Sequence, residues 1–441
     1  MTLVYEKIRL PLQLFFAAVF SLFLSSCTGG GGGYSSSMPW NNNPGVVTND
    51  PNAVPNIGWQ TPGDRRELAQ QNNAFLKDPD RPALVYGGAA RTKKVRVAML
   101  LPLTGKNADL GQSMLKAAQM AMFDVGSANF ELVPKDTKST SDGAAAAAQD
   151  AAQSGTSLFL GPIFAEDVRA VKPVASSSNI PMVAFTTDWS LGGGNTYIMG
   201  FLPFAQVSRV AQYAATHGAD KLAVYAPTTP YCDVVISTLQ RTSADVVRVE
   251  RYSPQQTDLT ALVEDFAATS NTSGDPKNPT FKFNALMLPV GGEGLRSLTS
   301  VLGLNGVNNK RVRFIGTGLW DDTQLTYDPS LYGAWFAAPD PKLRNDFDRR
   351  YQENYGGTPL RLASLAYDAT ALAAVLARTS GDNSPYSHDS MTNPRGFAGI
   401  DGIFRFRSDG LAERGLAVLE IQSGKARVID AAPTAFISSG S

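Results

Sequence analysis

The segment from Val95 to Asp124 restricts the possible folds more than any other part of the sequence. It begins with an unbroken apolar run, Val97 to Leu101, which is typical of a strand buried on both faces. Pro102 and Gly105 end that strand, because proline cannot donate to a sheet and glycine loosens the backbone. A helix with one apolar face follows, marked by Leu110, Met114, Ala118 and Met122. Together these elements form the first half of a parallel β-α-β unit.

The rest of the chain repeats this alternation in two series. The first series continues with strands at 130–135, 157–160 and 181–185 and with helices at 144–152 and 165–176. The second series begins at Leu222 and alternates in the same way as far as Gly316. In open α/β sheets, ligands bind beside the loops at the carboxyl ends of the strands. On these patterns alone, any doubly wound α/β domain fits the chain.

The length of the chain predicts two lobes, because 441 residues exceed what one hydrophobic core supports. We place residues 94–204 and 332–400 in the first lobe, residues 205–331 and 401–430 in the second, and residues 431–441 in a tail. Residues 400–407 and 416–421 are expected to form a hairpin of the second lobe. Three crossings between the lobes would form a hinge with a cleft.

Residues 1–26 have the pattern of a lipoprotein signal peptide, with an apolar stretch too short for a comfortable membrane span. Leu24-Ser25-Ser26-Cys27 resembles a bacterial lipobox, in which the cysteine is acylated; the alternative is a plain signal peptide before an accidental cysteine. Residues 27–93 are rich in Gly, Ser, Asn and Pro and predict a flexible tether. We therefore expect a lipid-anchored protein on the periplasmic face of the cell envelope, at the outer membrane.

The composition and the missing motifs argue against several functions. The chain has 39 basic and 39 acidic side chains, so neither nucleic acid nor an anionic membrane surface is expected as the main partner. His217 and His388 stand alone, outside any metal-ligand spacing. Asp321-Asp322 could act as paired acids, although a helix cap or a solvated loop is the simpler interpretation. Cys232 is expected to be a packed or partly exposed thiol. We predict no enzyme, no cofactor and no metal site.

Several segments, taken in order, resemble one family. LLPLTG followed by LGQ resembles the start of type 1 periplasmic binding proteins of the Leu/Ile/Val-binding kind. FLGPIFAEDVRAVKPVA, IPMVAFTTDWSLGGG, LMLPVGGEGLRSL, RFIGTGLWDD and GFAGIDGIFRF are similar to the members that are known as penicillin-binding protein activator lipoproteins. The resemblance covers about residues 95–430. It implies an α/β fold of two lobes, each built on a doubly wound parallel sheet, joined by a three-strand hinge.

The resemblance also implies where a ligand would bind. In amino-acid-binding relatives, a serine after the Gly-Pro strand end and an Ala-Ser-Thr-like triplet after the next strand hold the ligand's charged groups. Here Ala165 provides no hydroxyl after Gly161-Pro162, whereas Thr186 and Thr187 keep theirs, with loop capping as the alternative role. Tyr231 falls where a cleft aromatic is common. The candidate cleft residues are Leu103, Thr104, Gly105, Gly161, Pro162, Phe185, Thr186, Thr187, Asp188 and Tyr231.

Without a hydroxyl at Ala165, the chain lacks part of the site that holds an amino acid in these relatives. This absence favours a protein that acts by binding another protein. We predict a non-catalytic protein that binds and activates a peptidoglycan synthase, that is, a penicillin-binding protein, in cell-wall synthesis, and that meets the membrane through its lipid anchor only. The alternative is the substrate-binding receptor of an ABC importer for branched-chain or related amino acids, with an ABC permease as its partner. An enzyme of cell-wall turnover is a third possibility, which the absence of catalytic motifs disfavours.

Overall fold

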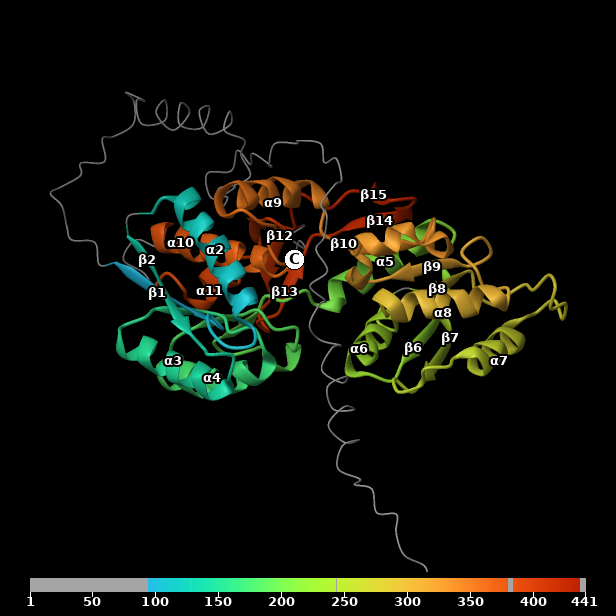
Figure 1. Cartoon of the computed structure of the whole chain (residues 1–441), viewed down its shortest axis with the longest axis horizontal. Helices are drawn as coiled ribbons and strands as arrows, with labels where there is room; N and C mark the ends of the chain where they lie inside the picture. The colour runs from blue at the N-terminus through green and yellow to red at the C-terminus, as the bar shows by residue number, and fades with distance from the viewer. Residues whose placement is uncertain (1–93, 128, 243, 380–383, 437–441) are drawn as a thin grey trace, which may run out of the picture. The chain divides into compact units, whose positions relative to one another are not determined.

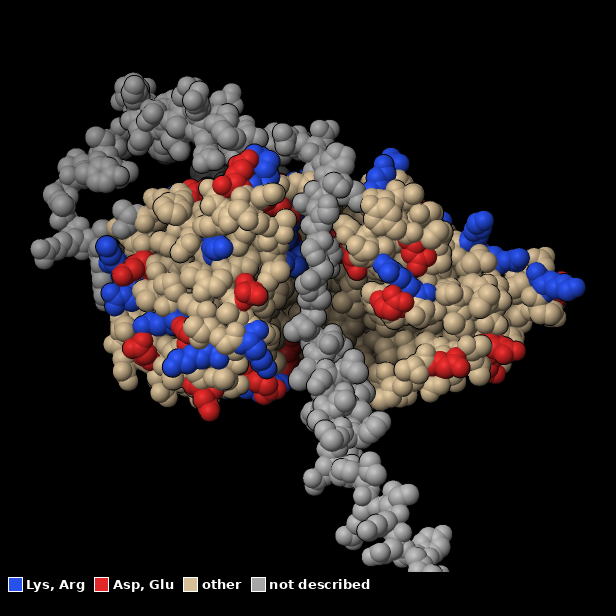
Figure 2. Space-filling view, in the orientation of Figure 1, with Lys and Arg blue, Asp and Glu red and all other residues tan. Residues whose placement is uncertain are grey.

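The computed structural model describes residues 94–127, 129–242, 244–379 and 384–436 (Figure 1). The expected signal peptide at 1–26, the expected lipidation site Cys27 and the expected tether at 27–93 lie outside the described residues, as does the end of the expected tail. Within these described ranges, no helix combines the length and the apolar character needed to cross a membrane. Figure 2 shows basic and acidic side chains intermingled over the visible face, in keeping with the 39 of each in the sequence.

The first series of strands forms a parallel sheet whose central strand is buried on both faces, as predicted. Val97, Met99 and Leu101 join one hydrophobic cluster, and Ala98 and Leu100 join another on the opposite face. The strands are β1 (Val95–Leu101), β2 (Phe130–Asp136), β3 (Leu158–Leu160), β4 (Met182–Ala184) and β5 (Thr196–Ile198), in the spatial order β2-β1-β3-β4-β5.

Helices cover both faces of this sheet (Figure 1). On one face, α2 packs against α10, and the predicted stripe points inward, because Met114 and Ala118 are fully buried and Leu110 and Met122 are half-buried. On the other face, α3 and α4 pack together over Ala98. The helices are α2 (Ala108–Val125), α3 (Ser141–Gln153), α4 (Ala165–Ser177), α9 (Pro341–Tyr355), α10 (Ala363–Thr379) and the short α11 (His388–Met391).

The second series forms a sheet that repeats the first and then extends it. Its strands are β6 (Lys221–Pro227), β7 (Asp245–Tyr252), β8 (Ala285–Met287), β9 (Arg313–Gly316), β10 (Trp335–Ala338), β14 (Ala417–Gln422) and β15 (Lys425–Asp430). The parallel part has the order β7-β6-β8-β9-β10, which matches the first sheet strand for strand. The antiparallel hairpin of β14 and β15 is added beyond β10. Two mainly parallel, doubly wound sheets confirm the predicted fold class.

Four helices and several single turns complete the second series. The helices are α5 (Pro203–Thr216), α6 (Pro230–Leu239), α7 (Thr260–Ser270) and α8 (Gly292–Leu304). The 3-10 turns of the chain are η1 (Trp189–Leu191), η2 (Gly318–Trp320), η3 (Thr323–Tyr327) and η4 (Pro329–Leu331). We call this sheet with its helices the second lobe, and the first sheet with its helices the first lobe.

The predicted hairpin of residues 400–407 with 416–421 is wrong. β12 (Gly402–Phe406) pairs instead with β11 (Phe397–Gly399) and β13 (Ala412–Arg414) in a small antiparallel sheet. The reason is an Asp-Gly turn, in which Gly410 has φ +80° and the chain reverses before Leu411. Phe404 and Phe406 then bury their rings in the first lobe, so this sheet belongs to that lobe.

Residues 332–338 also lie elsewhere than expected. Trp335–Ala338 is buried throughout and pairs with β9 and β14, so it is the fifth parallel strand of the second lobe and not the start of the return to the first. The chain therefore passes between the lobes at residues 199–202, 339–340 and 415–416. The Arg414 guanidinium donates a hydrogen bond to the Met199 carbonyl at 3.1 Å, which ties the first crossing to the third.

Candidate functional site

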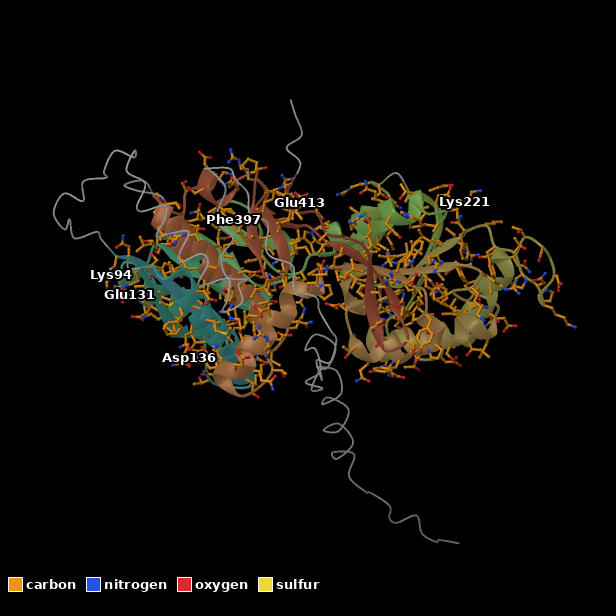
Figure 3. The ribbon with its side chains drawn as sticks, turned by 90° about the horizontal axis from the view of Figure 1, so that it is seen from above. Lys94, Glu131, Asp136, Lys221, Phe397 and Glu413 are labelled. Atoms are coloured by element: carbon orange, nitrogen blue, oxygen red, sulfur yellow. The ribbon has the colours of Figure 1, made fainter. Side chains whose placement is uncertain are left out.

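The loop after β1 is fastened to the end of β2 by one carboxylate. Asp136 accepts hydrogen bonds from the backbone N–H groups of Leu103 at 2.9 Å and Thr104 at 3.1 Å, and from the Thr104 hydroxyl at 2.6 Å. Burial raises the pKa of Asp136, but these hydrogen bonds outweigh it and leave the pKa lowered. Figure 3 places Asp136 at the opposite end of β2 from Glu131. Thr104 is exposed, but Asp136 already uses its hydroxyl.

Two glycines allow neighbouring loops to approach closely at the same sheet edge. Gly105 has φ +84°, and a Cβ there would lie 2.9 Å from a main-chain oxygen of the loop after β2. Gly161 has φ +96°, and a Cβ there would lie 2.3 Å from the carbonyl oxygen of Leu100. The Phe185 N–H donates to the Pro162 carbonyl at 2.9 Å. Because β1, β3 and β4 are adjacent, the loops that follow them share one edge.

The two threonines after β4 differ in what their hydroxyls do. The Thr186 side chain is 5% exposed, and its hydroxyl accepts a hydrogen bond from the Asp188 N–H at 3.1 Å, which is the capping role. Asp188 also forms an ion pair with Arg169 at 2.6 Å. Thr187 is exposed, and its hydroxyl has no hydrogen-bond partner among the described residues. Of the pair, Thr187 is therefore the one with a hydroxyl available to a ligand.

Tyr231 lies at the corresponding edge of the second lobe. Its hydroxyl donates to the Thr317 hydroxyl at 2.8 Å, and Thr317 is fully buried at the end of β9. Burial raises the pKa of Tyr231, so the phenol stays protonated and continues to donate. The next residue, Gly318, donates its N–H to the buried side chain of Gln206 at 2.8 Å. Thus α5 and the β9 loop are joined beside Tyr231.

An ion pair connects the two lobes. The guanidinium of Arg361, in the segment just before α10, lies 4.0 Å from the carboxylate of Asp321, in the loop after β9. Both side chains keep about a third of their surface exposed, 36% for Arg361 and 37% for Asp321. We call these two residues the interlobe pair. Since they are accessible, a dissolved ion can reach either side chain and compete with its partner.

Arg361 is held in place by groups from two other segments. Its guanidinium donates to Asp401 at 2.9 Å and to the Ser364 hydroxyl at 3.1 Å. Its plane lies over the ring of Phe201, which belongs to the first crossing, with 4.1 Å from Cζ to the ring centroid. The interlobe pair is therefore attached directly to the hinge region.

Asp401, which pairs with Arg361, and its neighbour Asp368 have pKa values that are shifted in opposite directions. Burial raises the pKa of Asp401, but Arg361, Arg344 and Arg414 outweigh burial and lower it. Asp368 is 2% exposed, and burial together with the charge of Asp401 raises its pKa. Asp368 also accepts a hydrogen bond from the Ile400 N–H at 2.7 Å. A fixed negative charge at Asp401 thus supports the guanidinium of Arg361.

Sequence reasoning did not find Arg361, Asp401 or Phe201. Arg361 is a single cation in front of an apolar helix, and Asp401 lies in an ordinary turn sequence, so neither carries a motif. The sequence suggests Asp321 only as one half of an Asp321-Asp322 pair, whereas in the structure the two carboxylates have different partners. Asp322 caps η3 by accepting from the Gln324 N–H at 2.8 Å, as the simpler interpretation holds, whereas Asp321 faces Arg361.

Two further expectations concern single residues. Ala165 begins α4, and the preceding Phe164 gives no side-chain cap, so this turn has no hydroxyl to offer a ligand. Cys232 is 1% exposed, and its thiol lies 3.7 Å from the Pro289 carbonyl, which confirms a packed thiol. Burial raises the pKa of that thiol. Within the described ranges, no group of three or more His, Cys, Asp or Glu side chains is arranged to hold a metal ion.

Comparison with known proteins agrees with this architecture. The sequence profile of a family described as periplasmic binding protein matches residues 94–426. No curated protein sequence matches the chain significantly.

Three solved structures illustrate the similarity. A protein assigned to branched-chain amino acid ABC transport from Rhodospirillum rubrum superposes with a TM-score of 0.66 at 18% identity, over 76% of this chain and 100% of that one. The branched-chain amino acid transporter substrate binding protein LivJ from Streptococcus pneumoniae, in complex with isoleucine, gives 0.52 at 20% identity, over 77% and 100%. An ABC transporter solute binding protein from R. palustris, in complex with benzoate, gives 0.54 at 15% identity, over 78% and 98%.

Proposed function

This chain belongs to the periplasmic binding protein family, and we propose that it is an extracytoplasmic receptor that binds a small carboxylate-bearing solute between its two lobes. The family is generally non-catalytic, and the charges of the interlobe pair are suited to holding an ion. The solute class is an inference from Arg361. The import of that solute would require an ABC permease as partner.

The observation that carries this proposal is the accessible guanidinium of Arg361. It is fixed by Asp401 and stacked on Phe201, yet it is still 36% exposed beside a partner at 4.0 Å. A guanidinium that is oriented in advance binds a carboxylate through two parallel hydrogen bonds. A ligand carboxylate would displace Asp321 from Arg361, and an ammonium group on the same ligand would then meet Asp321. Thr187 and Tyr231 are the further ligand contacts that we propose.

The solved structures support the same ligand class without fixing it. LivJ is in complex with isoleucine, and the R. palustris protein is in complex with benzoate, so both ligands carry a carboxylate. At 20% and 15% identity these structures share the fold with this chain. We therefore propose a carboxylate and leave the rest of the solute open, with branched-chain amino acids and benzoates as the first compounds to examine.

A second candidate is the activation of a peptidoglycan synthase by a protein lipid-anchored at Cys27. The ordered segments that resemble the activator lipoproteins favour it, and so does the missing hydroxyl at Ala165. In that case the interlobe pair would hold the lobes together instead of receiving a solute. The two candidates differ in whether a free solute binds at all.

Isothermal titration calorimetry of the mature chain separates the candidates. The panel is leucine, isoleucine, valine, glutamate and benzoate, with leucinol as a matched compound that lacks the carboxylate. We expect one of the carboxylates to bind with a Kd of about 10 μM or lower, and leucinol not to bind. If no carboxylate binds and the chain instead stimulates a purified penicillin-binding protein, the receptor proposal fails and the activator proposal replaces it.

A further inference from the structure

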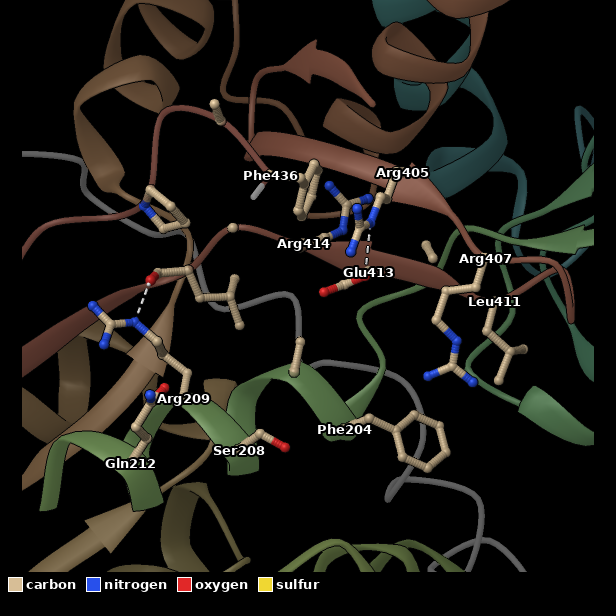
Figure 4. A pocket seen from close by; sticks show the side chains of 16 residues that line it. Phe204, Ser208, Arg209, Gln212, Arg405, Arg407, Leu411, Glu413, Arg414 and Phe436 are labelled. Carbon is tan, nitrogen blue, oxygen red and sulfur yellow. Dashed lines mark hydrogen bonds and ion pairs between the residues drawn. The ribbon is translucent and has the colours of Figure 1, made fainter. Parts of the chain in front are cut away.

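A cavity lies beside the third crossing, between α5 and strands β12 and β13 of the small sheet (Figure 4). Its volume is about 530 Å³. We call it the hinge pocket; Phe204, Arg209, Arg405, Arg407, Arg414 and Phe436 are the lining residues that determine its character. None of the candidate cleft residues lines it, and neither does Arg361 or Asp321.

The lining of the hinge pocket carries an excess of basic side chains, although three of them form ion pairs. Among its described lining residues are four arginines and a single acid, Glu413, which pairs with Arg405 at 2.9 Å. Arg209 pairs with Asp430 at 2.8 Å, and Arg407 pairs with its near neighbour Asp409.

Arg414 differs from the other three arginines. It is 6% exposed and has no hydrogen bond to any carboxylate of the described residues. Its guanidinium lies against the rings of Phe201 and Phe404. Asp401 and Asp368 lie near enough to raise its pKa, although burial lowers the pKa overall. One guanidinium in the wall therefore has no hydrogen-bonded counter-ion.

The three outer arginines also have unused donors. Arg209 bonds through Nε and Nη2, Arg405 through Nε and Nη1, and Arg407 through Nε and Nη2. The remaining terminal nitrogen of each has no hydrogen-bond partner among the described residues. Their side chains are 21%, 23% and 47% exposed, so an ion in the pocket can approach them. Guanidinium groups of this kind bind oxyanions.

The rest of the lining is apolar. Phe204 comes from α5, Leu411 precedes β13, and Phe436 comes from the C-terminal segment, where its ring stacks on Arg405 at 4.4 Å (Figure 4). Apolar walls with a few convergent polar groups, in a cavity of about this volume, are typical of small-molecule sites. The pocket thus combines guanidinium groups that can donate hydrogen bonds to an oxyanion with space for the apolar part of a ligand.

We infer that the hinge pocket binds a small organic anion, with its oxyanion group on Arg209, Arg405 and Arg407 and its apolar part against Phe204 and Phe436. Such a ligand would contact the second lobe through α5 and the first lobe through β12 and β13. The site is separate from the one proposed for the solute. A negative result for this site would therefore not affect the proposed receptor function.

The test uses phenyl phosphate as the probe, because it joins an oxyanion to an apolar ring. Calorimetry on the mature chain should show one saturable site, weaker binding of inorganic phosphate and no binding of benzyl alcohol. Gln212→Glu adds a negative charge at an exposed lining position whose side chain has no hydrogen bond within the described residues, so the fold should be preserved. It should weaken phenyl phosphate binding at least about fivefold.

Two controls connect the binding to this pocket. Gln119→Glu makes the same charge change at an exposed position of α2 and should leave the affinity unchanged. Arg361→Gln should also leave it unchanged, whereas Arg405→Gln should reduce it. The inference is overturned if phenyl phosphate does not bind, if benzyl alcohol or inorganic phosphate binds equally well, or if Gln212→Glu and Arg405→Gln both bind like the wild type.

Discussion

Arg361 of the first lobe lies 4.0 Å from Asp321 of the second, and this ion pair joins loops that are 40 residues apart in the sequence. Arg361 is anchored by the nearly completely buried Asp401, whereas the Asp321 carboxylate has no other hydrogen-bond or ion-pair partner among the described residues. We therefore propose that Arg361 keeps its position when a ligand binds and that Asp321 gives way to it.

Replacing Asp321 with Asn should affect ligands according to their charge. The substitution removes the anion that competes for Arg361, so benzoate, which has no ammonium group, should bind about threefold to tenfold more tightly. Leucine should lose affinity, because its ammonium group loses the carboxylate that we propose as its partner. Calorimetry with both ligands measures the direction of each change in affinity. A change in the same direction for both ligands would contradict the role of Asp321.

Replacing Asp368 with Asn should flatten the pH dependence of stability. The folded-state pKa of Asp368 is raised by burial and by Asp401, so its contribution is fully present below about pH 4 and is lost as the pH rises through the folded-state value. Between about pH 4 and 8 the free energy of unfolding of the variant should therefore fall less than that of the wild type, by up to about 4 kcal/mol for a folded-state pKa of about 7. Urea denaturation at several pH values measures both slopes, and equal slopes would refute the assignment.

Substitutions of the two threonines after β4 should have different effects, one on the stability of the protein and the other on solute affinity. Thr186→Val removes a buried acceptor from the Asp188 N–H and should cost about 1 kcal/mol of stability. Thr187→Val changes an exposed side chain, so stability should be unchanged while solute affinity falls about tenfold. Thermal denaturation and calorimetry on both variants provide the comparison. The assignment fails if the two substitutions exchange effects.

Replacing Cys27 with Ser should prevent lipidation and release the protein from membranes. The prediction rests on the Leu24-Ser25-Ser26-Cys27 sequence alone. Membrane fractionation followed by mass spectrometry of the mature N-terminus measures the outcome. A wild-type protein without lipid would show that the segment is a plain signal peptide.

The fold was largely predictable because its strands carry local signals. Val97–Leu101 reads as a strand buried on both faces, and the stripe that includes Met114 and Ala118 indicates the inward side of α2. Trp335–Ala338 was assigned to the wrong lobe because its pattern shows burial but not which neighbours it pairs with. Similarly, the Asp-Gly turn at Gly410 pairs β12 with β13, which comes before the expected partner β14 in the sequence.

The candidate site was less predictable because its central residues carry no motif. Topology was sufficient to place Gly161 and Phe185 at one sheet edge. It was not sufficient to show that Arg361, far along the chain, is held by Asp401 and reaches the loop after β9. An ion pair between distant residues depends on the packing of whole elements, and the local sequence around each partner does not encode it.

The role of Arg361 is tested by the affinity of the best-bound carboxylate for the wild type, Arg361→Gln, Arg361→Lys and Arg96→Gln. Arg96 is a matched control, because it is another first-lobe arginine with 39% side-chain exposure and an ion pair, here with Glu131. We predict that Arg361→Gln lowers the affinity at least about tenfold, that Arg361→Lys loses less, and that Arg96→Gln is unchanged. An Arg361→Gln protein that is folded and binds the carboxylate as tightly as the wild type would contradict the account.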